Sequence, residues 1–371
     1  MGRAAAVLGF DRAAVPRPVR GGRVLSRLRV GLVGCGWVAS HRHAPAYRRS
    51  GRADVVAAYD RREDRASALA RRVGATPYAG DLHAMLARER LDVVSICTPP
   101  WLHREQAEAA FEAGAHVLVE KPMAMSEADC AGMVRAAERA GRTLCVSHNF
   151  LFSRAVGEVA RRVDAGRAGR IESVLGFQMS TPRRRLPDWY ESLPGQLFFD
   201  EAPHLVYLSR RFLGPDEPIL LHASSKEAPG EAIQRTQNVV GVLQGATGLG
   251  VLTMTFNASR AEWGLAVVGS EQTYVVDLFR DQLLVMGRGG AHKPAEVLSQ
   301  TLGGLLQMAG GAVSSGALYA TGRLLYGHLV LVSRFLTSVV EGTPPPVSGD
   351  DGRRTIGLLE AICRDAGLLA R

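Results

Sequence analysis

The chain has 371 residues, of which 46% are hydrophobic and 22% are charged, proportions typical of a globular protein with room for two domains. Its net charge is +9. Residues 1–28 contain six arginines against one acid, Asp11, so more than half of the excess lies in a leader that we expect to be disordered. Because no basic stripe stands out in the remaining chain, the composition argues against nucleic acid as a partner.

The leader lacks the sustained apolar core of a secretory signal. The cysteines show no paired spacing, which favours a reduced, cytoplasmic protein over a disulfide framework, and no metal site is expected. They are Cys35, Cys97, Cys130, Cys145 and Cys363.

Between residue 29 and about residue 148, short apolar runs alternate with helical patterns. This alternation predicts βαβ units and a parallel, doubly wound sheet. The strand-like runs are Arg29–Val33, Asp54–Tyr59, Val93–Cys97, His116–Val119 and Thr143–Ser147, and the helical stretches include Arg61–Val73, Leu102–Ala113 and Glu127–Ala140.

The first strand leads directly into Gly34-Cys35-Gly36-Trp37-Val38-Ala39, a G-x-G-x-x-A pattern at a strand-to-helix turn. Gly34 permits the tight turn, Gly36 lets a pyrophosphate approach the backbone, and Ala39 allows close helix packing. The helix beginning near Trp37 and Val38 would receive the negative charge at its N-terminus. The pattern therefore predicts a dinucleotide site, although a purely structural turn is the alternative.

Asp60 ends the second strand, where a carboxylate would accept the adenosine ribose hydroxyls. A carboxylate there favours NAD over NADP, because it would repel a 2′-phosphate. Arg61 and Arg62 follow immediately and could pair with such a phosphate instead, so NADP stays open as the alternative.

Only three of the 45 basic residues are lysines: Lys121, Lys226 and Lys293. Lys121 follows the buried-looking strand His116–Val119 in a chain that otherwise uses arginine for positive charge. An ammonium can shift its pKa and take part in proton transfer, whereas a guanidinium stays charged. Lys121 is therefore a candidate for chemistry, while a lysine without a role fits the other two.

After about residue 150 the pattern changes to strands joined by short turns, which predicts an α+β domain with an antiparallel sheet. A helix is expected at Ala155–Ala165. The strand-like runs are Ile171–Met179, Val239–Leu243, Gly250–Phe256, Leu265–Val268 and Tyr274–Leu278.

Residues 297–322 carry no charge, but their glycines and polar residues argue against a membrane span. We expect a helical segment that is buried or lies at an oligomer interface. Association with a membrane surface is the alternative.

Asp200 and His204 lie four residues apart, so they share one face of a predicted helix in which Pro203 falls in the first turn. Hydride transfer at a C–OH carbon needs a matching proton transfer, and histidine titrates near neutrality. The alternatives are an N-cap role for Asp200 and a packing role for His204.

Together these motifs resemble the glucose–fructose oxidoreductase, inositol dehydrogenase and MocA family of nicotinamide-dependent oxidoreductases. The resemblance rests on the glycine pattern, on the Thr98-Pro99 loop before a helix, and on Glu120-Lys121-Pro122 after the fifth strand. It covers residues 29–371, including the closing run from Gly342 to Ser348.

The resemblance implies a Rossmann domain over residues 29–149 and an α/β domain with an open, mainly antiparallel sheet over residues 150–371. The C-terminal helix could pack back on the first domain. The cofactor would be NAD, or NADP, with contacts from Thr98, Pro99, His103 and Glu120. Lys121 would lie beside the nicotinamide and the substrate oxygen, with Asp200 and His204 completing the catalytic set.

The sequence departs from the family on the substrate side. Gln196 and Pro203 replace small residues near the aspartate and histidine, and Tyr207 stands where many relatives have a second acid. The run after Asn149 also lacks an arginine that is often found there. These changes put the substrate class in doubt more than the redox chemistry.

The family implies a polyhydroxylated substrate such as a sugar, cyclitol or nucleotide sugar, and a homodimer or homotetramer formed through the sheet face. A NAD-dependent glycosidase with transient oxidation and a non-catalytic NAD-binding sensor are the alternative functions. Arg183-Arg184-Arg185 could hold an anionic group or simply be a solvated charge run. The candidate substrate residues are His148, Asn149, Tyr190 and Arg185.

Overall fold

The structure, a computed structural model, describes residues 27–181, 189–214, 216–227, 236–289 and 293–369. The chain divides into two compact units, residues 1–149 with 327–356 and residues 150–326 with 357–371. This differs from the expected division at residue 150, because a late segment returns to the first unit. The first strand also begins at Leu28, and Arg27 donates to the carbonyl oxygen of Ala53, so the folded part starts inside the expected leader.

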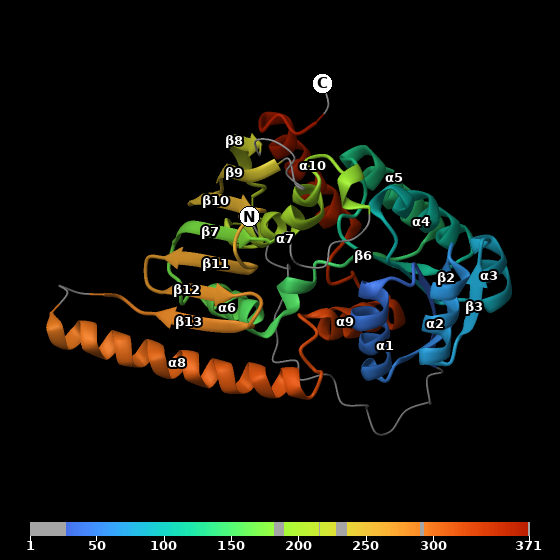
Figure 1. The fold of residues 1–371 in the computed structure, drawn as a ribbon, viewed down its shortest axis with the longest axis horizontal. Coiled ribbons are helices and arrows are strands. Elements are labelled where there is room, and N and C mark those ends of the chain that lie inside the picture. The colour runs from blue at the N-terminus through green and yellow to red at the C-terminus, as the bar shows by residue number, and fades with distance from the viewer. Residues whose placement is uncertain (1–26, 182–188, 215, 228–235, 290–292, 370–371) are drawn as a thin grey trace. The chain divides into compact units, whose positions relative to one another are not determined.

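The first unit is built on a six-stranded sheet with the order β3-β2-β1-β4-β5-β6, and every pair of neighbouring strands is parallel (Figure 1). The predicted doubly wound sheet is therefore confirmed. Its strands are β1 Leu28–Val33, β2 Ala53–Asp60, β3 Thr76–Ala79, β4 Val93–Ile96, β5 His116–Val119 and β6 Leu144–Val146; its helices are α1 Ala44–Ser50, α2 Glu63–Val73, α3 Leu82–Glu89, α4 His103–Glu112 and α5 Glu127–Ala140.

The returning segment adds helix α9, His328–Glu341, to the first unit, where it packs against α1. The chain then runs back beside β6, and the N–H of Val146 donates to the carbonyl oxygen of Val347 at 3.2 Å. Helix α10, Gly349–Asp365, begins in this unit and continues into the second from Gly357.

The second unit contains a seven-stranded sheet with the order β13-β12-β11-β7-β10-β9-β8. The sheet is mainly antiparallel, as predicted, except that β7 and β10 run parallel. Its strands are β7 Ile171–Met179, β8 Ile219–Glu227, β9 Thr236–Gln244, β10 Leu249–Thr255, β11 Glu262–Gly269, β12 Thr273–Asp277 and β13 Gln282–Met286; its helices are α6 Arg154–Asp164, α7 Leu197–Phe212 and α8 Pro294–Ala320.

Helix α7 lies close against one face of this sheet because β7 has a glycine where they meet. A Cβ on Gly176 would lie 3.2 Å from Leu205 of the helix, tighter than ordinary contact. The helix begins after Gln196, so Pro203 is in its interior and not in its first turn as predicted. Pro203 therefore cannot donate to the carbonyl four residues earlier, which an N–H would do in a regular helix.

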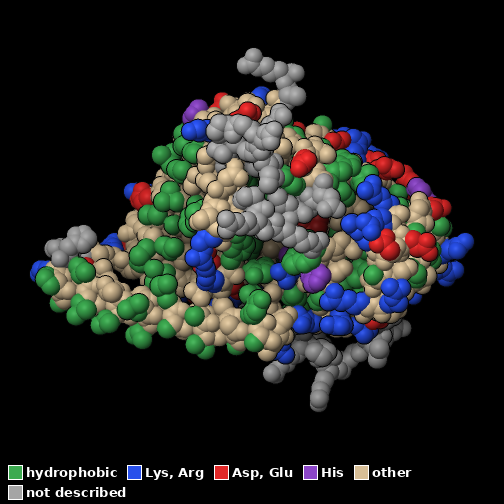
Figure 2. Space-filling model, viewed as in Figure 1, with side chains coloured by type: hydrophobic (Ala, Val, Ile, Leu, Met, Phe, Trp, Pro, Cys, Tyr) green, Lys and Arg blue, Asp and Glu red, His purple; other side chains and the backbone are tan. Residues whose placement is uncertain are grey.

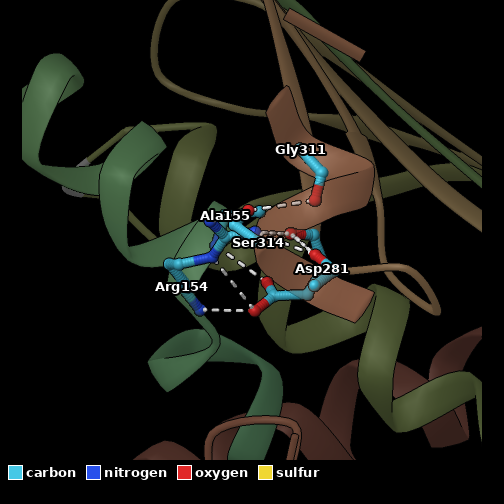
Figure 3. Close-up of polar contacts among 6 residues, drawn as sticks. Arg154, Ala155, Asp281, Gly311 and Ser314 are labelled. Carbon is cyan, nitrogen blue, oxygen red and sulfur yellow. Dashed lines mark hydrogen bonds and ion pairs between the residues drawn. The ribbon is translucent and has the colours of Figure 1, made fainter. Parts of the chain in front are cut away.

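Asp281 joins the β12–β13 turn to α6 and α8 (Figure 3). Its buried carboxylate accepts the N–H groups of Arg154 and Ala155 at 3.3 and 2.8 Å, which caps the start of α6. The Arg154 guanidinium in turn donates to the Asp281 carbonyl at 2.8 Å and to Ser314 of α8 at 2.7 Å. Three elements that are distant in sequence are thus fixed by one polar cluster.

Among the described helices, none is both long enough and apolar enough to cross a bilayer. Helix α8, which covers most of the uncharged segment, is largely exposed in this chain, so of the two expected placements burial within the chain is not found, and the interface placement stays a prediction. The five cysteines are free thiols.

Candidate active site

The functional motifs of the first unit follow the carboxyl ends of its parallel strands, the edge at which ligands of doubly wound sheets bind. After β1, Gly34 has a φ of +87°, and a Cβ there would lie 2.8 Å from the backbone of Cys97 and Thr98. A Cβ on Gly36 would instead meet nothing within 4 Å. The first glycine is therefore required by the turn, and the second leaves room for a group to approach the backbone, as a pyrophosphate would require.

Asp60 ties the end of β2 to this glycine turn. Its two carboxylate oxygens accept the N–H groups of Cys35 at 2.8 Å and Arg62 at 2.9 Å. A carboxylate has about four acceptor positions, so these two bonds leave capacity for ribose hydroxyls. Asp60 is the last residue of β2, at the carboxyl end where the sequence predicted it.

The residues around Asp60 and the glycine turn differ in their exposure and in the side chains that they contact. The Arg62 guanidinium is paired with Asp64 at 2.7 Å, and Arg61 is exposed. Trp37 is exposed and stacks on His41 with 4.9 Å between ring centroids, while the Arg42 guanidinium lies over its indole. Val38 is half-buried in the turn that starts the helical segment.

Thr98 and Pro99 lie in the loop after β4, and the His103 side chain contacts the backbone of that loop. The His103 ring is fully buried, with Nε2 at 2.7 Å from the Thr98 carbonyl oxygen and Nδ1 at 3.1 Å from the Met123 carbonyl oxygen. Burial lowers the pKa of His103. A neutral imidazole has one N–H, so His103 donates to one of these carbonyl oxygens and packs against the other, between the Thr98-Pro99 loop and the chain after Glu120-Lys121-Pro122.

Glu120 forms a buried charge cluster that sequence analysis did not find. Its Oε1 is 2.7 Å from His43 Nε2 and 3.7 Å from His328 Nε2, and its Oε2 accepts the Lys121 N–H at 3.0 Å. His43 Nδ1 is 2.8 Å from Ser95 Oγ of β4. The side chain of Glu120, expected to contact the cofactor, points into the domain and holds the Lys121 peptide.

These three side chains are also a set that could ligate a metal among the described residues. The 2.7 Å separation between His43 and Glu120 is the length of a charge-assisted hydrogen bond, and two ligands of one zinc ion lie further apart. Burial alone would lower the pKa of His43, but Cys97 and Glu120 outweigh it and raise that pKa to about 10. Burial would raise the pKa of Glu120, yet His328 and His43 hold it well below its usual range. The cluster is therefore an ion pair.

Lys121 is half-buried and precedes a cis peptide bond to Pro122. His148 and Asn149 follow β6 at the same edge of the sheet, and both side chains are buried. The edge thus gathers the cofactor and substrate candidates of this unit from five strands, β1, β2, β4, β5 and β6.

In the second unit, His204 lies in α7 among aromatic rings. Its Nδ1 is 2.8 Å from the Tyr207 hydroxyl, which also accepts the Phe150 N–H at 3.1 Å. Its ring centroid is 4.9 Å from that of Phe150 and 5.1 Å from that of Trp263. Tyr207, which stands where the family pattern has an acid, therefore orients the imidazole with a neutral group.

Asp200 is half-buried in the first turn of α7, one turn before His204. The N-cap of the helix is Gln196, so the N-cap alternative for Asp200 is wrong. Tyr190 is buried in a short 3-10 turn, and burial raises its pKa. Arg185, with Arg183 and Arg184, lies outside the described residues.

The buried polar atoms of the second unit that have no hydrogen-bond partner among the described residues include Trp263 Nε1, Gln178 Oε1 and Ser180 Oγ. Gln178 and Trp263 are direct partners on β7 and β11, and the Gln178 amide donates to Glu201 of α7. Unsatisfied buried groups are rare and call for an explanation. Sequence analysis missed them, because nothing in a strand pattern distinguishes a recognition group from a core residue.

The buried cluster of Glu120, His43 and His328 predicts how the free energy of unfolding changes with pH. The raised pKa of His43 stabilises the folded state. This contribution is fully present when the pH is below the ordinary histidine pKa of 6.5, and it is lost as the pH rises through the raised pKa of about 10. The lowered pKa of Glu120 adds stability above 4.5 that is lost only in acid. The difference in unfolding free energy between the wild type and Glu120→Gln should therefore shrink between pH 6.5 and 10, measured by urea denaturation. Glu108→Gln, at an exposed pair with Arg104, should show a flat difference across that range. A flat difference for Glu120→Gln as well would refute the ion pair.

Comparison with known proteins gives three kinds of match. Residues 28–148 match the GFO_IDH_MocA model, described as an oxidoreductase family with an NAD-binding Rossmann fold. The 1-carboxy-3-chloro-3,4-dihydroxycyclohexa-1,5-diene dehydrogenase of Comamonas testosteroni is 30% identical over 58% of this chain and 54% of its own length. The myo-inositol 2-dehydrogenase of Thermotoga maritima is 26% identical over 89% of this chain and 93% of its own.

The fold of the whole chain is also found among solved structures. The WlbA dehydrogenase from Bordetella pertussis, solved with NADH and UDP-GlcNAcA, covers 92% of this chain and 96% of its own with a TM-score of 0.73 at 24% identity. The chain spans about half the length of several curated relatives that it matches, the Comamonas enzyme among them.

The matched segment extends from β1 to β6 and contains every motif at the carboxyl edge of the parallel sheet. The seven-stranded sheet that follows completes the fold of the relatives. Residues 28–148 therefore match the NAD-binding Rossmann fold of the Gfo/Idh/MocA oxidoreductase family, and the likeness to solved structures over the rest of the chain is one of fold.

Proposed function

We propose that this protein is an NAD-dependent dehydrogenase that moves a hydride between the nicotinamide and a hydroxyl-bearing or keto carbon of a sugar, cyclitol or nucleotide sugar. The observation that carries the proposal is the carboxyl edge of the parallel sheet. There the glycine turn, Asp60 and the Lys121 loop follow three strands of one domain. The relatives support the reaction class, and the positions of these residues at one edge of the sheet support their proposed roles.

The cofactor assignment rests on Gly34, Gly36 and Asp60. The open space at Gly36 fits a pyrophosphate, and the remaining acceptor capacity of Asp60 fits ribose hydroxyls. Both arginines after Asp60 are exposed, but Arg62 is already paired with Asp64. These features favour NAD over NADP.

When bound, the nicotinamide supplies hydride acceptance and donation. In the oxidising direction, loss of hydride from the carbon must be matched by loss of the hydroxyl proton. We assign that proton to His204, whose ring is oriented through Nδ1 by Tyr207. The ammonium of Lys121 would stabilise the developing negative charge on the substrate oxygen. Asp200 would orient the catalytic side chains or relay the proton.

The substrate class is argued from the second unit. The relatives named above act on a dihydroxylated ring and on myo-inositol, and the solved relative was crystallised with a nucleotide sugar. Trp263, Gln178 and Ser180 offer one donor and two further polar atoms, buried and unpaired among the described residues, in the unit that contains His204. Such a set suits a ligand that carries several hydroxyl groups, since each hydroxyl both donates and accepts.

The cofactor assignment predicts that nucleotide-stripped protein binds NADH more tightly than NADPH in a calorimetric titration. Asp60→Ala should weaken NADH binding by at least about tenfold, because two charge-assisted hydrogen bonds are lost. It should also reduce the preference over NADPH, because the carboxylate no longer repels a 2′-phosphate. Tighter binding of NADPH by the wild type would transfer the role to Arg61 and overturn the assignment.

The catalytic assignment predicts that Lys121→Met and His204→Ala each lower kcat by at least about 100-fold, while the Kd for NADH changes less than about threefold. Turnover is followed by NADH absorbance in a screen of polyols, cyclitols and nucleotide sugars. Lys226→Met and His222→Ala are matched controls, since both side chains are exposed on β8. A loss below about tenfold in either catalytic variant would contradict its role. Turnover without net NADH formation would identify the glycosidase alternative.

Trp263→Phe keeps an aromatic ring and removes the indole N–H. If that N–H binds substrate, KM should rise about tenfold with kcat nearly unchanged, because one hydrogen bond of ground-state and transition-state binding is lost. The melting temperature of the free protein should stay equal or increase, since an unsatisfied buried donor has been removed. A lower melting temperature with unchanged KM would show that Trp263 serves packing alone.

A further inference from the structure

Helix α8 is unusually exposed for a helix of its length. It contains 27 residues, and Ser315 is its only buried residue. In proteins most of the stability of a helix comes from packing one of its faces, so a helix that buries so little of itself is poorly supported within this chain. Its sequence adds a second anomaly, since residues 297–322 contain no charged side chain.

One narrow strip of α8 faces its own unit. The Gln307 side-chain amide forms two hydrogen bonds with the backbone of Val285 in the edge strand β13. It accepts the Val285 N–H at 2.9 Å and donates to the Val285 carbonyl oxygen at 3.2 Å. Gly304 and Gly311 lie along the same strip, where a Cβ would lie 3.7 Å from Leu284 and 3.3 Å from Gln282. The Arg154 cluster fixes Ser314 and Ser315 one turn further (Figure 3).

The remaining surface of α8 is mostly apolar, with Ser299, Gln300 and Thr301 as exposed polar residues near its start. Figure 2 shows hydrophobic side chains distributed along the whole length of this helix. Gly303, Gly310 and Gly316 lie between them, and a Cβ at any of the three would meet nothing within 4 Å. The surface therefore alternates large side chains with notches. The exposed large residues are Val297, Leu298, Leu302, Leu305, Leu306, Met308, Val313 and Tyr319.

We propose that this face of α8 packs antiparallel against α8 of a second copy of the chain. The outward half of a helix of 27 residues, about 40 Å long and about 11 Å wide, amounts to roughly 700 Å². Standard interfaces bury about 800 Å² per partner. Exposed apolar patches of this size on soluble proteins mark interaction sites.

The absence of charge argues for a second copy as the partner. A two-fold axis brings the same patch of both subunits together, so like charges on the patch would repel. An uncharged patch avoids that penalty, and an antiparallel pair also opposes the two helix dipoles. A helix that binds an anionic membrane surface is typically rich in lysine and arginine along its polar face, and none occurs between residues 297 and 322.

The first experiment compares masses by sedimentation velocity for the full-length protein. The wild type should be a dimer or larger, and the double variant Leu306→Glu with Val313→Glu should fall to half of that mass. Two buried carboxylates facing two more should raise the Kd at least about 100-fold. Val340→Glu is the matched control, because Val340 is also exposed and apolar but lies in α9. A monomeric wild type, or a double variant with unchanged mass, overturns the proposal.

Crosslinking tests the arrangement in proteins that keep the apolar face. Leu306 lies near the middle of α8, so an antiparallel pair places the two copies of this residue side by side. Oxidation of Leu306→Cys should therefore give a covalent dimer. Val297→Cys should not, because its two copies would lie about 30 Å apart. Crosslinks at both positions, or at neither, overturn the arrangement. Cosedimentation of the wild type, but not of the double variant, with phosphatidylcholine–phosphatidylglycerol vesicles would make the face a membrane contact and overturn it as well.

Discussion

The burial of one carboxylate organises the first unit. A buried charge is tolerated only when it is paired and hydrogen-bonded, and Glu120 is satisfied by two histidines and by the N–H of Lys121. Its partners come from the turn after β1 and from α9, more than two hundred residues later. The return of the chain to the first unit and the conformation of the Lys121 loop therefore depend on the same interaction.

Asp60 serves the glycine turn in a comparable way. By accepting the Cys35 and Arg62 N–H groups, it joins the end of β2 to the loop after β1. His103 lies between the loops after β4 and β5, with one ring nitrogen near a carbonyl oxygen of each. Polar side chains thus connect neighbouring loops at the carboxyl edge, and the backbone that would face a dinucleotide is held before any ligand arrives.

The second unit combines a close-packed helix with buried polar groups. Gly176 of β7 lets α7 pack close to the sheet, and α7 contains Asp200 and His204. Tyr207 orients His204 with a neutral phenol in the position of a family acid. The same unit carries the exposed apolar face of α8.

The local sequence determined the parallel sheet, the glycine turn, the acid at the end of β2 and the lysine after β5, because each depends on neighbouring residues or on a fixed strand-to-turn spacing. It missed β3 and β13, which are short, and β8, whose alternation is weak and largely exposed. Only the tertiary structure decided that Glu120 faces inward, that Pro203 is inside α7, and that Trp263 and Gln178 are buried without partners. These features depend on contacts between residues that can lie more than two hundred positions apart, and no local pattern contains that information.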